Sequence, residues 1–439
     1  MGGGVSSTKG TKTVVVLGAA YGDVYVMPRY AVLPGHEYKA FIPYTKVFLT
    51  ESPKPEHIHL EAEVTELRPN SVTLSRSFPE LGIPTTTLAF DYVIYALGSH
   101  LPPPLDLWGP STGKTQYHGQ KAEGCQWFQE KQQMVKDAPS VLVVGGGALG
   151  IRMFKFSPAM FRRMVTRFLE FATDIKSVYP EKSVTLLHSR QRLLPRFDEK
   201  MHDEIRSACE KLEIELILGE RLDLDSIEDG SAKVNAAGQK VVRTVAGREI
   251  AADLLLLCTG QAPNTGFLKA MDPATVDAAT GLIRVCKTLQ VSATPRAAAH
   301  SPAVSITAAL ADVSLAADAS LAPKAEDSAP AYPHIFAIGD AADAWGAIPA
   351  GHNAYAQGEL AAKNIVRLIK NSTADGEAQA LQEYTPGPPA IKVSLGLTNA
   401  VYQVGPNIGF KTDGEPDLQA ALIWPYFGIK VESDEDMRL

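Results

Sequence analysis

Four short apolar runs in this sequence end abruptly in a glycine, and this pattern restricts the possible folds more than any other feature. The runs close in Leu17-Gly18, Leu97-Gly98, Val144-Gly145 and Ile338-Gly339. Together with similar runs at 184–187 and 253–258, they alternate with segments of helical periodicity, which is typical of parallel α/β sheets. Such sheets bind ligands at the carboxyl ends of their strands. We therefore expect ligand sites at these glycine turns.

The turn after Val144 has the complete pattern of a dinucleotide-binding loop. Gly145, Gly147 and Gly150 form a G-x-G-x-x-G directly after a predicted strand. The first glycine allows the tight turn, the second lets the backbone approach a pyrophosphate, and the third packs the following helix on the strand. The alternative is a tight turn that binds nothing.

The turn after Leu17 begins in the same way but is not completed. Gly18, Ala20 and Gly22 occupy the glycine positions, yet the sequence VYVMPRY follows where an amphipathic helix is expected. A helix and a strand, most of a βαβ unit of about 30 residues, are absent. Because the missing strand normally lies between two others, its loss opens the sheet and exposes an apolar edge.

Two further strand ends carry polar side chains suited to nucleotides. Ser189 and Arg190 follow a strand at the position where NAD-specific sites carry an acid, and a guanidinium there favours the 2′-phosphate of NADPH or tolerance of both cofactors. The alternative is an arginine on a loop surface. Gly339 and Asp340 follow the run IFAI, and the helical segment 354–369 directs its N-terminal dipole toward the same strand end. Asp340 suits the hydroxyls of a flavin ribityl chain, or serves as a simple N-cap.

Two segments interrupt the α/β pattern. Removal of residues 152–169 restores a continuous strand, glycine turn, helix and strand, so this run is an insertion. It carries five basic residues and Pro158, and its alternatives are a basic amphipathic helix or a product of gene structure such as a retained intron. Residues 292–330 are rich in Ala, Ser and Pro and are expected to form a partly disordered loop.

Composition excludes several classes of protein. The net charge of −7 argues against a nucleic-acid partner, and no apolar run reaches the length that spans a bilayer. The four cysteines are far apart and form no CxxC pair, which fits a reducing cytoplasm. No metal site is expected. Met1-Gly2 with Ser6 matches an N-myristoylation pattern, which would give weak attachment to a membrane or lipid droplet, and the alternative is a flexible tail.

Five motifs resemble, in the same order, those of flavoprotein reductases with two dinucleotide-binding domains. They are VVVLGAAYG, YALGS, VLVVGGGALG, CTGQAPN and IFAIGDAAD. The resemblance covers residues 13–370 and is greatest for the apoptosis-inducing-factor-like and ferroptosis-suppressor-like branch. The segments GAAYG and AGHNAYAQGE are similar to those of fungal members. The resemblance implies an α/β fold with two Rossmann-like domains, an NAD(P) domain inserted in an FAD domain, and a small C-terminal region. The expected boundaries are a tail at 1–12, an FAD domain at 13–110 and 261–370, an NAD(P) domain at 138–260, and a C-terminal region at 383–439.

The resemblance also assigns cofactor-binding residues, whereas no catalytic residue is expected because the cofactors carry the chemistry. The implied FAD contacts are Gly18, Ala20, Gly22, Gly98, Ser99, Gly339 and Asp340, with Pro28, Arg29 and Lys46 against the flavin. The implied NADPH or NADH contacts are Gly145, Gly147, Gly150, Glu170, Ser189, Arg190 and Gly260.

The implied activity is hydride transfer from NAD(P)H to FAD, followed by electron transfer to a quinone-type or other small acceptor. Because the first βαβ unit is shortened, we expect weak FAD binding. Two alternatives remain open at this point. One is a nucleotide-binding sensor or interaction protein with impaired catalysis. The other, a flavin monooxygenase, lacks the additional motifs of that family.

Overall fold

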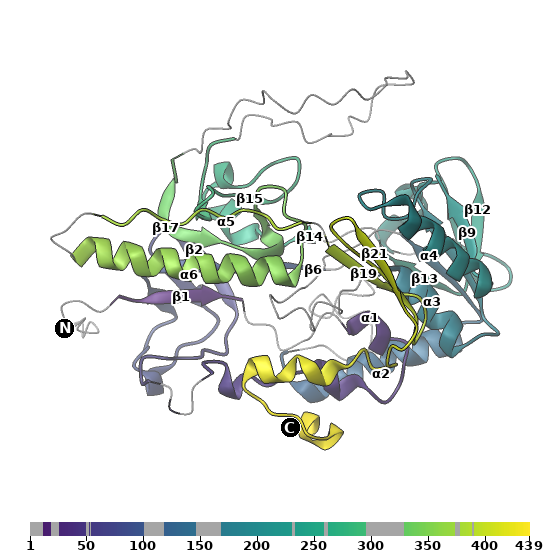
Figure 1. Cartoon of the computed structure of the whole chain (residues 1–439), viewed down its shortest axis with the longest axis horizontal. Helices are drawn as coiled ribbons and strands as arrows, with labels where there is room; N and C mark the ends of the chain where they lie inside the picture. The colour runs from purple at the N-terminus through teal and green to yellow at the C-terminus, as the bar shows by residue number, and fades with distance from the viewer. Residues whose placement is uncertain are drawn as a thin grey trace.

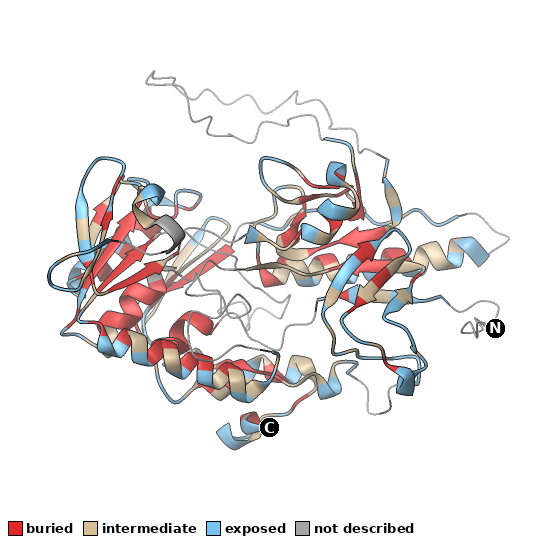
Figure 2. Cartoon of the chain, turned by 180° about the vertical axis from the view of Figure 1, so that it is seen from behind, coloured by how far each residue is buried: buried red, intermediate tan, exposed pale blue. Residues whose placement is uncertain are grey.

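The computed structural model describes most of the chain and arranges it in two lobes (Figure 1). The described residues are 12–18, 26–49, 52, 54–100, 118–145, 168–230, 233–258, 262–295, 329–373, 378–388 and 390–439. Each lobe contains a four-stranded sheet, and each sheet has its own hydrophobic core. Figure 2 shows the buried residues in two corresponding groups. The α/β class with two Rossmann-like halves is thereby confirmed.

The first lobe is built on the sheet β1-β5-β17-β16. Its strands are β1 (Val14–Leu17), β5 (Tyr92–Tyr95), β17 (Tyr332–Ala337) and β16 (Gln290–Val291). The first three are parallel, and β16 runs antiparallel to β17. The long helix α6 (Gly351–Thr373) runs along this lobe and buries Ala361 and Ile365 in the core that also contains Leu17 and Phe336 (Figure 1).

Strand β1 is the outer strand of this sheet. Among the described residues it pairs only with β5. Its alternate side chains Val14 and Val16 are 42% and 61% exposed, whereas Leu17 is buried. In a parallel sheet a strand after a glycine turn is normally covered on both faces. The exposure of the two valines agrees with the lack of a second neighbouring strand among the described residues.

The second lobe is built on the parallel sheet β13-β7-β8-β9. Its strands are β7 (Ser140–Val144), β8 (Ser183–His188), β9 (Glu215–Leu218) and β13 (Leu254–Leu257). The accompanying helices are α2 (Lys121–Asp137), α3 (Phe168–Val178) and α4 (Glu199–Lys211). Strands β7, β8 and β13 are apolar runs buried on both faces, as expected for the interior of a parallel sheet.

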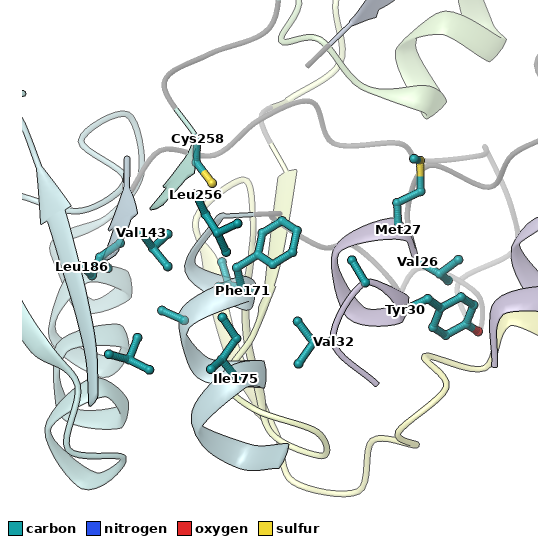
Figure 3. Close-up of a cluster of buried hydrophobic side chains, with 14 of the residues drawn as sticks. Val26, Met27, Tyr30, Val32, Val143, Phe171, Ile175, Leu186, Leu256 and Cys258 are labelled. Carbon is teal, nitrogen blue, oxygen red and sulfur yellow. The ribbon is translucent and has the colours of Figure 1, made fainter. Parts of the chain in front are cut away.

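Helix α1 (Met27–Tyr30) belongs to the core of the second lobe, although the sequence predicts that residues 13–110 lie in the FAD domain. Figure 3 shows Val32 between α1 and α3, with the strands of the second sheet on the other side of α3, and Val26, Met27 and Tyr30 belong to the same hydrophobic core. The first described element after β1 therefore packs in the other lobe.

The C-terminal region packs against both α3 and the segment after α1. Its antiparallel sheet is formed by β19 (Ala390–Ser394), β20 (Ala400–Val404) and β21 (Asn407–Lys411), and β19 contacts α3. Three 3₁₀ helices follow, η7 (Ala420–Leu422), η8 (Trp424–Phe427) and η9 (Asp434–Arg438). They close on η1 (Glu37–Ala40), where Lys39 is paired with both Asp417 and Asp434 at 2.8 Å.

The remaining elements are short. They are η2 (Tyr44–Lys46), β2 (Val64–Arg68), β3 (Ser71–Leu74), η3 (Pro79–Leu81), β4 (Thr87–Ala89), β6 (Ser99–His100), η4 (Leu224–Gly230), β10 (Lys233–Val234), β11 (Lys240–Arg243), β12 (Glu249–Ala252), β14 (Ala262–Pro263), α5 (Gly266–Met271), η5 (Pro273–Thr275), β15 (Ile283–Arg284), η6 (Gly339–Ala341) and β18 (Ala342–Asp343). The tail at 1–11, most of the insertion at 152–169 and most of the loop at 292–330 lie outside the described residues.

Candidate functional site

The glycine turns of the two lobes are built in the same way. Gly18 follows β1 with φ +113°, and a Cβ atom there would lie 2.3 Å from the carbonyl oxygen of Ala96. Gly145 follows β7 with φ +115°, and its Cβ would lie 2.2 Å from the carbonyl oxygen of Cys258. In both lobes the glycine crosses directly over the residue that follows the neighbouring parallel strand. Only glycine fits, because any side chain would overlap that carbonyl.

The surroundings of the two turns differ on one side. The N–H of Gly145 donates a 2.7 Å hydrogen bond to the carbonyl of Leu187 on β8, so the turn after β7 is held between two strands. Strand β1 has no described neighbour on the corresponding side. Within the described part of the chain, β5 is therefore the one strand that supports the turn at Gly18.

Ser99 and Asp340 are brought together from segments far apart in the sequence. The hydroxyl of Ser99 donates a 3.0 Å hydrogen bond to the Asp340 carboxylate. Both residues follow a glycine with positive φ, +63° at Gly98 and +71° at Gly339. The N–H of Gly339 in turn donates to Gln357 Oε1 on α6 at 2.7 Å. The sheet edge of the first lobe thus carries one oriented carboxylate close to two glycine turns.

Asn264 holds the turn at Gly98 and was not predicted as a site residue. Its N–H donates to the carbonyl of Gly98 at 2.9 Å, and its side-chain amide donates to Leu97 at 2.9 Å. The hydroxyl of Tyr95 donates to the Asn264 carbonyl at 2.6 Å, and burial raises the pKa of this phenol, which keeps the donor protonated. The sequence CTGQAPN contained the signal, since an Asn after a strand end commonly organises a turn.

The same segment connects the two lobes. Strand β14 pairs with β6, which begins at Ser99, and β14 follows the end of β13 in the second sheet. Figure 1 shows this strand pair between the two lobes. The carboxyl ends of β5 and β13 are therefore tied to one another, and the two glycine turns belong to one connected region.

Ser189 and Arg190 are exposed residues that follow β8. The carbonyl of Arg190 accepts the N–H of Gly219 at 3.0 Å, which fixes the backbone and leaves the guanidinium at the surface. The glycine turn at Gly145 is bonded to this strand at Leu187. The placement is that of the ribose-contacting position in a dinucleotide domain.

The structure corrects the positions expected for Pro28, Arg29 and Glu170. Pro28 and Arg29 are predicted to lie against the flavin, but both are buried in α1 within the second lobe. The guanidinium of Arg29 is occupied by Asp174 at 2.6 Å. Glu170 is fully buried, and its Oε1 accepts the N–H of Ser394 on β19 at 3.0 Å. These buried polar groups therefore join protein segments, because burial without such partners would be costly.

Burial controls the ionisation of the carboxyl groups of Glu170 and Asp174. Burial and the nearby Asp174 together raise the pKa of Glu170 to about 8, against the opposing effects of Arg29 and of the hydrogen bonds from Ser394. The pKa of Asp174 is also raised by burial, while Arg29 opposes the shift. Glu170 is thus held largely as a neutral acid at pH 7.

Lys46 lies on the exposed surface of η2, where its Cβ is 2.9 Å from the position of a Cβ built on Gly428. Its described contact is thus with the C-terminal segment. Of the other predicted site residues, Ala20, Gly22, Gly147, Gly150 and Gly260 lie outside the described residues.

The site has neither a metal cluster nor a dithiol in the part of the chain that the structure describes. No group of three His, Cys, Asp or Glu side chains is placed to hold a metal ion there. All four cysteines are free, and Cys209, Cys258 and Cys286 are buried. Burial raises the pKa of the Cys258 thiol well above its ordinary value, so it is unsuited to nucleophilic chemistry.

The residues present fit one half of FAD better than the other. The Gly18 turn, the Ser99–Asp340 pair and the start of α6 suit a ribityl chain and its phosphate. The adenosine half normally lies along a second strand whose acid binds the ribose. No such strand lies beside β1 among the described segments.

Two connected sheets, each with a glycine turn at a strand end, define the class of two-dinucleotide-domain oxidoreductases. The chain belongs to the pyridine nucleotide-disulphide oxidoreductase family, whose profile matches residues 57–296. Members of this family use FAD and NAD(P)H, and the chain shares their flavoprotein oxidoreductase character.

Similar proteins support this assignment. Fe-regulated protein 8 of Mycosarcoma maydis is 36% identical over 93% of this chain and 86% of its own length. Human ferroptosis suppressor protein 1 is 26% identical over 72% of this chain and 65% of its own length. The solved structure of the sulfide:quinone oxidoreductase from Aquifex aeolicus shares the fold, with a TM-score of 0.58 and 12% identity over 97% of this chain and 94% of that one. The expected branch of the family, apoptosis-inducing-factor-like and ferroptosis-suppressor-like, is confirmed.

None of the described helices combines the length and the apolar character needed to cross a bilayer.

Proposed function

We propose that this oxidoreductase passes hydride from NAD(P)H to a bound flavin and then delivers electrons to a quinone-type acceptor. The observation that carries the proposal is the connection of the two glycine turns, at Gly18 and Gly145, through the β6–β14 pair. That connection ties a flavin site and a nicotinamide nucleotide site to one region, as transfer between two rings requires.

The bound flavin supplies the two-electron chemistry, and the chain's residues position the reactants. Asp340, oriented by Ser99, would accept hydrogen bonds from ribityl hydroxyls. The backbone at Gly145, which has no side chain, would let a nicotinamide pyrophosphate approach closely. Asn264 keeps the Gly98 turn in place through its bonds to Gly98 and Leu97.

The cysteines support a small acceptor that takes electrons directly from the flavin. A disulfide-reducing relay needs a pair of cysteines next to the flavin, and the four cysteines of this chain form no close pair in sequence. A quinone is a small planar acceptor that needs no such relay. We place the protein in the cytoplasm, with weak attachment to a membrane or lipid droplet through Gly2 if the tail is myristoylated.

The test is anaerobic reduction followed by reoxidation. The full chain is supplied with excess flavin and mixed with NADPH or NADH, and loss of the visible flavin absorbance is recorded. A soluble quinone is then added, and we expect the absorbance to return with one quinone consumed per NAD(P)H. Reduction without reoxidation by quinone would reject the acceptor. No reduction at all would favour the second candidate, a nucleotide-binding protein without catalysis, which is supported by the lack of a second partner for β1 among the described strands.

A further inference from the structure

We propose that this chain holds the flavin, ribityl and first phosphate portion of its cofactor but has no site for the adenosine portion, so that FMN and FAD bind with equal affinity. The inference rests on the proposed function, because it concerns the same flavin site. It follows from four features of the first lobe.

The first feature is the length of the connection after the Gly18 turn. Only residues 19–26 separate Gly18 from Met27, where α1 begins. A crossover to a neighbouring parallel strand takes a dozen or more residues before that strand is counted. Eight residues cannot supply both a helix and the strand whose acid would bind the adenosine ribose.

The second feature is the exposed side of β1. Val14 and Val16 are 42% and 61% exposed, and β5 is the strand's sole described partner. In the second lobe the equivalent strand β7 lies between β13 and β8, and the Gly145 turn is bonded to β8 through Leu187. The two lobes thus differ at the position that carries the ribose contact in a dinucleotide domain.

The third feature is that the nearest segment of chain is held elsewhere. Helix α1 packs on α3 in the second lobe, and its Arg29 is buried against Asp174 at 2.6 Å. The other nitrogens of Arg29 donate to carbonyls of Gly396 and Pro416, both at 2.9 Å. Moving α1 back over β1 would separate a buried ion pair, which is strongly unfavourable.

The fourth feature is that the flavin half does not depend on the missing strand. Asp340 is oriented by Ser99, and Gly339 by Gln357 on α6. These residues come from β6, η6 and α6, all on the side of β5 and β17. A ribityl phosphate can therefore be bound although, among the described residues, no second strand lies beside β1 to carry the adenosine.

Titration of the full chain with FMN and with FAD tests the inference without an activity measurement. Binding is measured from the quenching of flavin fluorescence. We expect the two dissociation constants to agree within about threefold. In a complete site the acid–ribose hydrogen bonds alone would make FAD bind about ten- to hundredfold tighter. Asp340→Asn should weaken both flavins by the same factor, because its contact is to the portion that they share.

The outcomes separate this inference from the proposed function. FAD binding at least about tenfold tighter than FMN would overturn the inference and leave the proposed function intact. Equal binding together with a bound flavin that NADPH fails to reduce would reject the proposed function and leave the inference standing. Failure of both flavins to bind would overturn both.

Discussion

The guanidinium of Arg29 lies 2.6 Å from the carboxylate of Asp174, and their side chains are 1% and 0% exposed. The remaining nitrogens of Arg29 donate to the carbonyls of Gly396, Leu397 and Pro416. One side chain therefore joins the segment after the first glycine turn, helix α3 of the second lobe, and the C-terminal region. This contact explains why α1 leaves the lobe in which its sequence position would place it.

Removal of this cation should destabilise the chain strongly. Arg29→Met leaves the buried Asp174 without its positive partner, which we expect to lower the free energy of unfolding by about 3–5 kcal/mol. Urea unfolding followed by circular dichroism measures the effect. Arg206→Met is the matched control, because it removes an exposed ion pair with Glu210 on α4 and should cost less than about 1 kcal/mol. Similar losses of unfolding free energy for the two variants would show that the buried ion pair contributes no more to stability than the exposed one.

The stability of the chain should depend on pH through Glu170. Its pKa rises from an ordinary value of 4.5 to about 8 on folding, so the folded chain keeps a proton that the unfolded chain has released. The free energy of unfolding therefore falls as pH rises from about 4.5 to about 8. Glu170→Gln removes this dependence, and the wild type should lose up to about 1.4 kcal/mol per pH unit more than the variant.

Unfolding curves at several pH values between about 5 and 8 measure this slope. Glu249→Gln, a change at an exposed position of β12, serves as the control and should leave the slope unchanged. Parallel curves for the wild type and Glu170→Gln would mean that Glu170 is ionised in the folded chain.

Alanine at the two glycine turns should separate the two nucleotide sites. Gly145→Ala places a methyl group against the carbonyl of Cys258 and should abolish NADP⁺ binding while flavin binding persists. Gly18→Ala, against Ala96, should have the opposite effect. Calorimetry with each nucleotide gives both affinities.

Gly247→Ala is the control for backbone strain alone. Gly247 has φ +88° with no atom within 4 Å of its Cβ position, so the substitution should cost about 1–3 kcal/mol and leave both sites intact. If Gly145→Ala cost no more than this control and kept its NADP⁺ affinity, close approach of the backbone would not be a requirement of the site.

Arg190 should select the phosphorylated nicotinamide cofactor. Its side chain is exposed at the end of β8, so Arg190→Ala should weaken NADP⁺ binding about tenfold and hardly affect NAD⁺. Arg196→Ala, which removes another exposed arginine from the same loop, is the control for general charge. Equal losses for NADP⁺ and NAD⁺ would assign Arg190 to the shared part of the cofactor.

Much of the fold was predictable because its signals are local. The apolar runs that end at Gly18, Gly98, Gly145 and Gly339 all appear as strand ends, each with a positive φ. The predicted helix at 354–369 is present as α6 (Gly351–Thr373). Such signals survive in a single sequence because a glycine with a required backbone conformation is recognisable without its neighbours.

Helix α2 shows a local signal that the sequence analysis missed. Gln120 and Glu123 stand three residues apart at its start, and the Glu123 carboxylate accepts the N–H of His118 at 2.7 Å. This spacing is a helix-start pattern, although Gln is an unusual first residue for it. The helix has few apolar residues, and it buries Trp127 and Phe128 on one face, so its helical periodicity is weak in the sequence.

The α/β class, the two glycine turns, and the lack of room for a helix and strand after Gly18 can be read from residue type and chain length alone. The position of α1, in contrast, depends on contacts between distant parts of the chain. Arg29 follows the glycine turn in sequence, yet its partners lie on α3 and in the C-terminal region. A buried cation must find carboxylate and carbonyl oxygens in three dimensions, and nothing in the neighbouring sequence specifies which distant segments supply them.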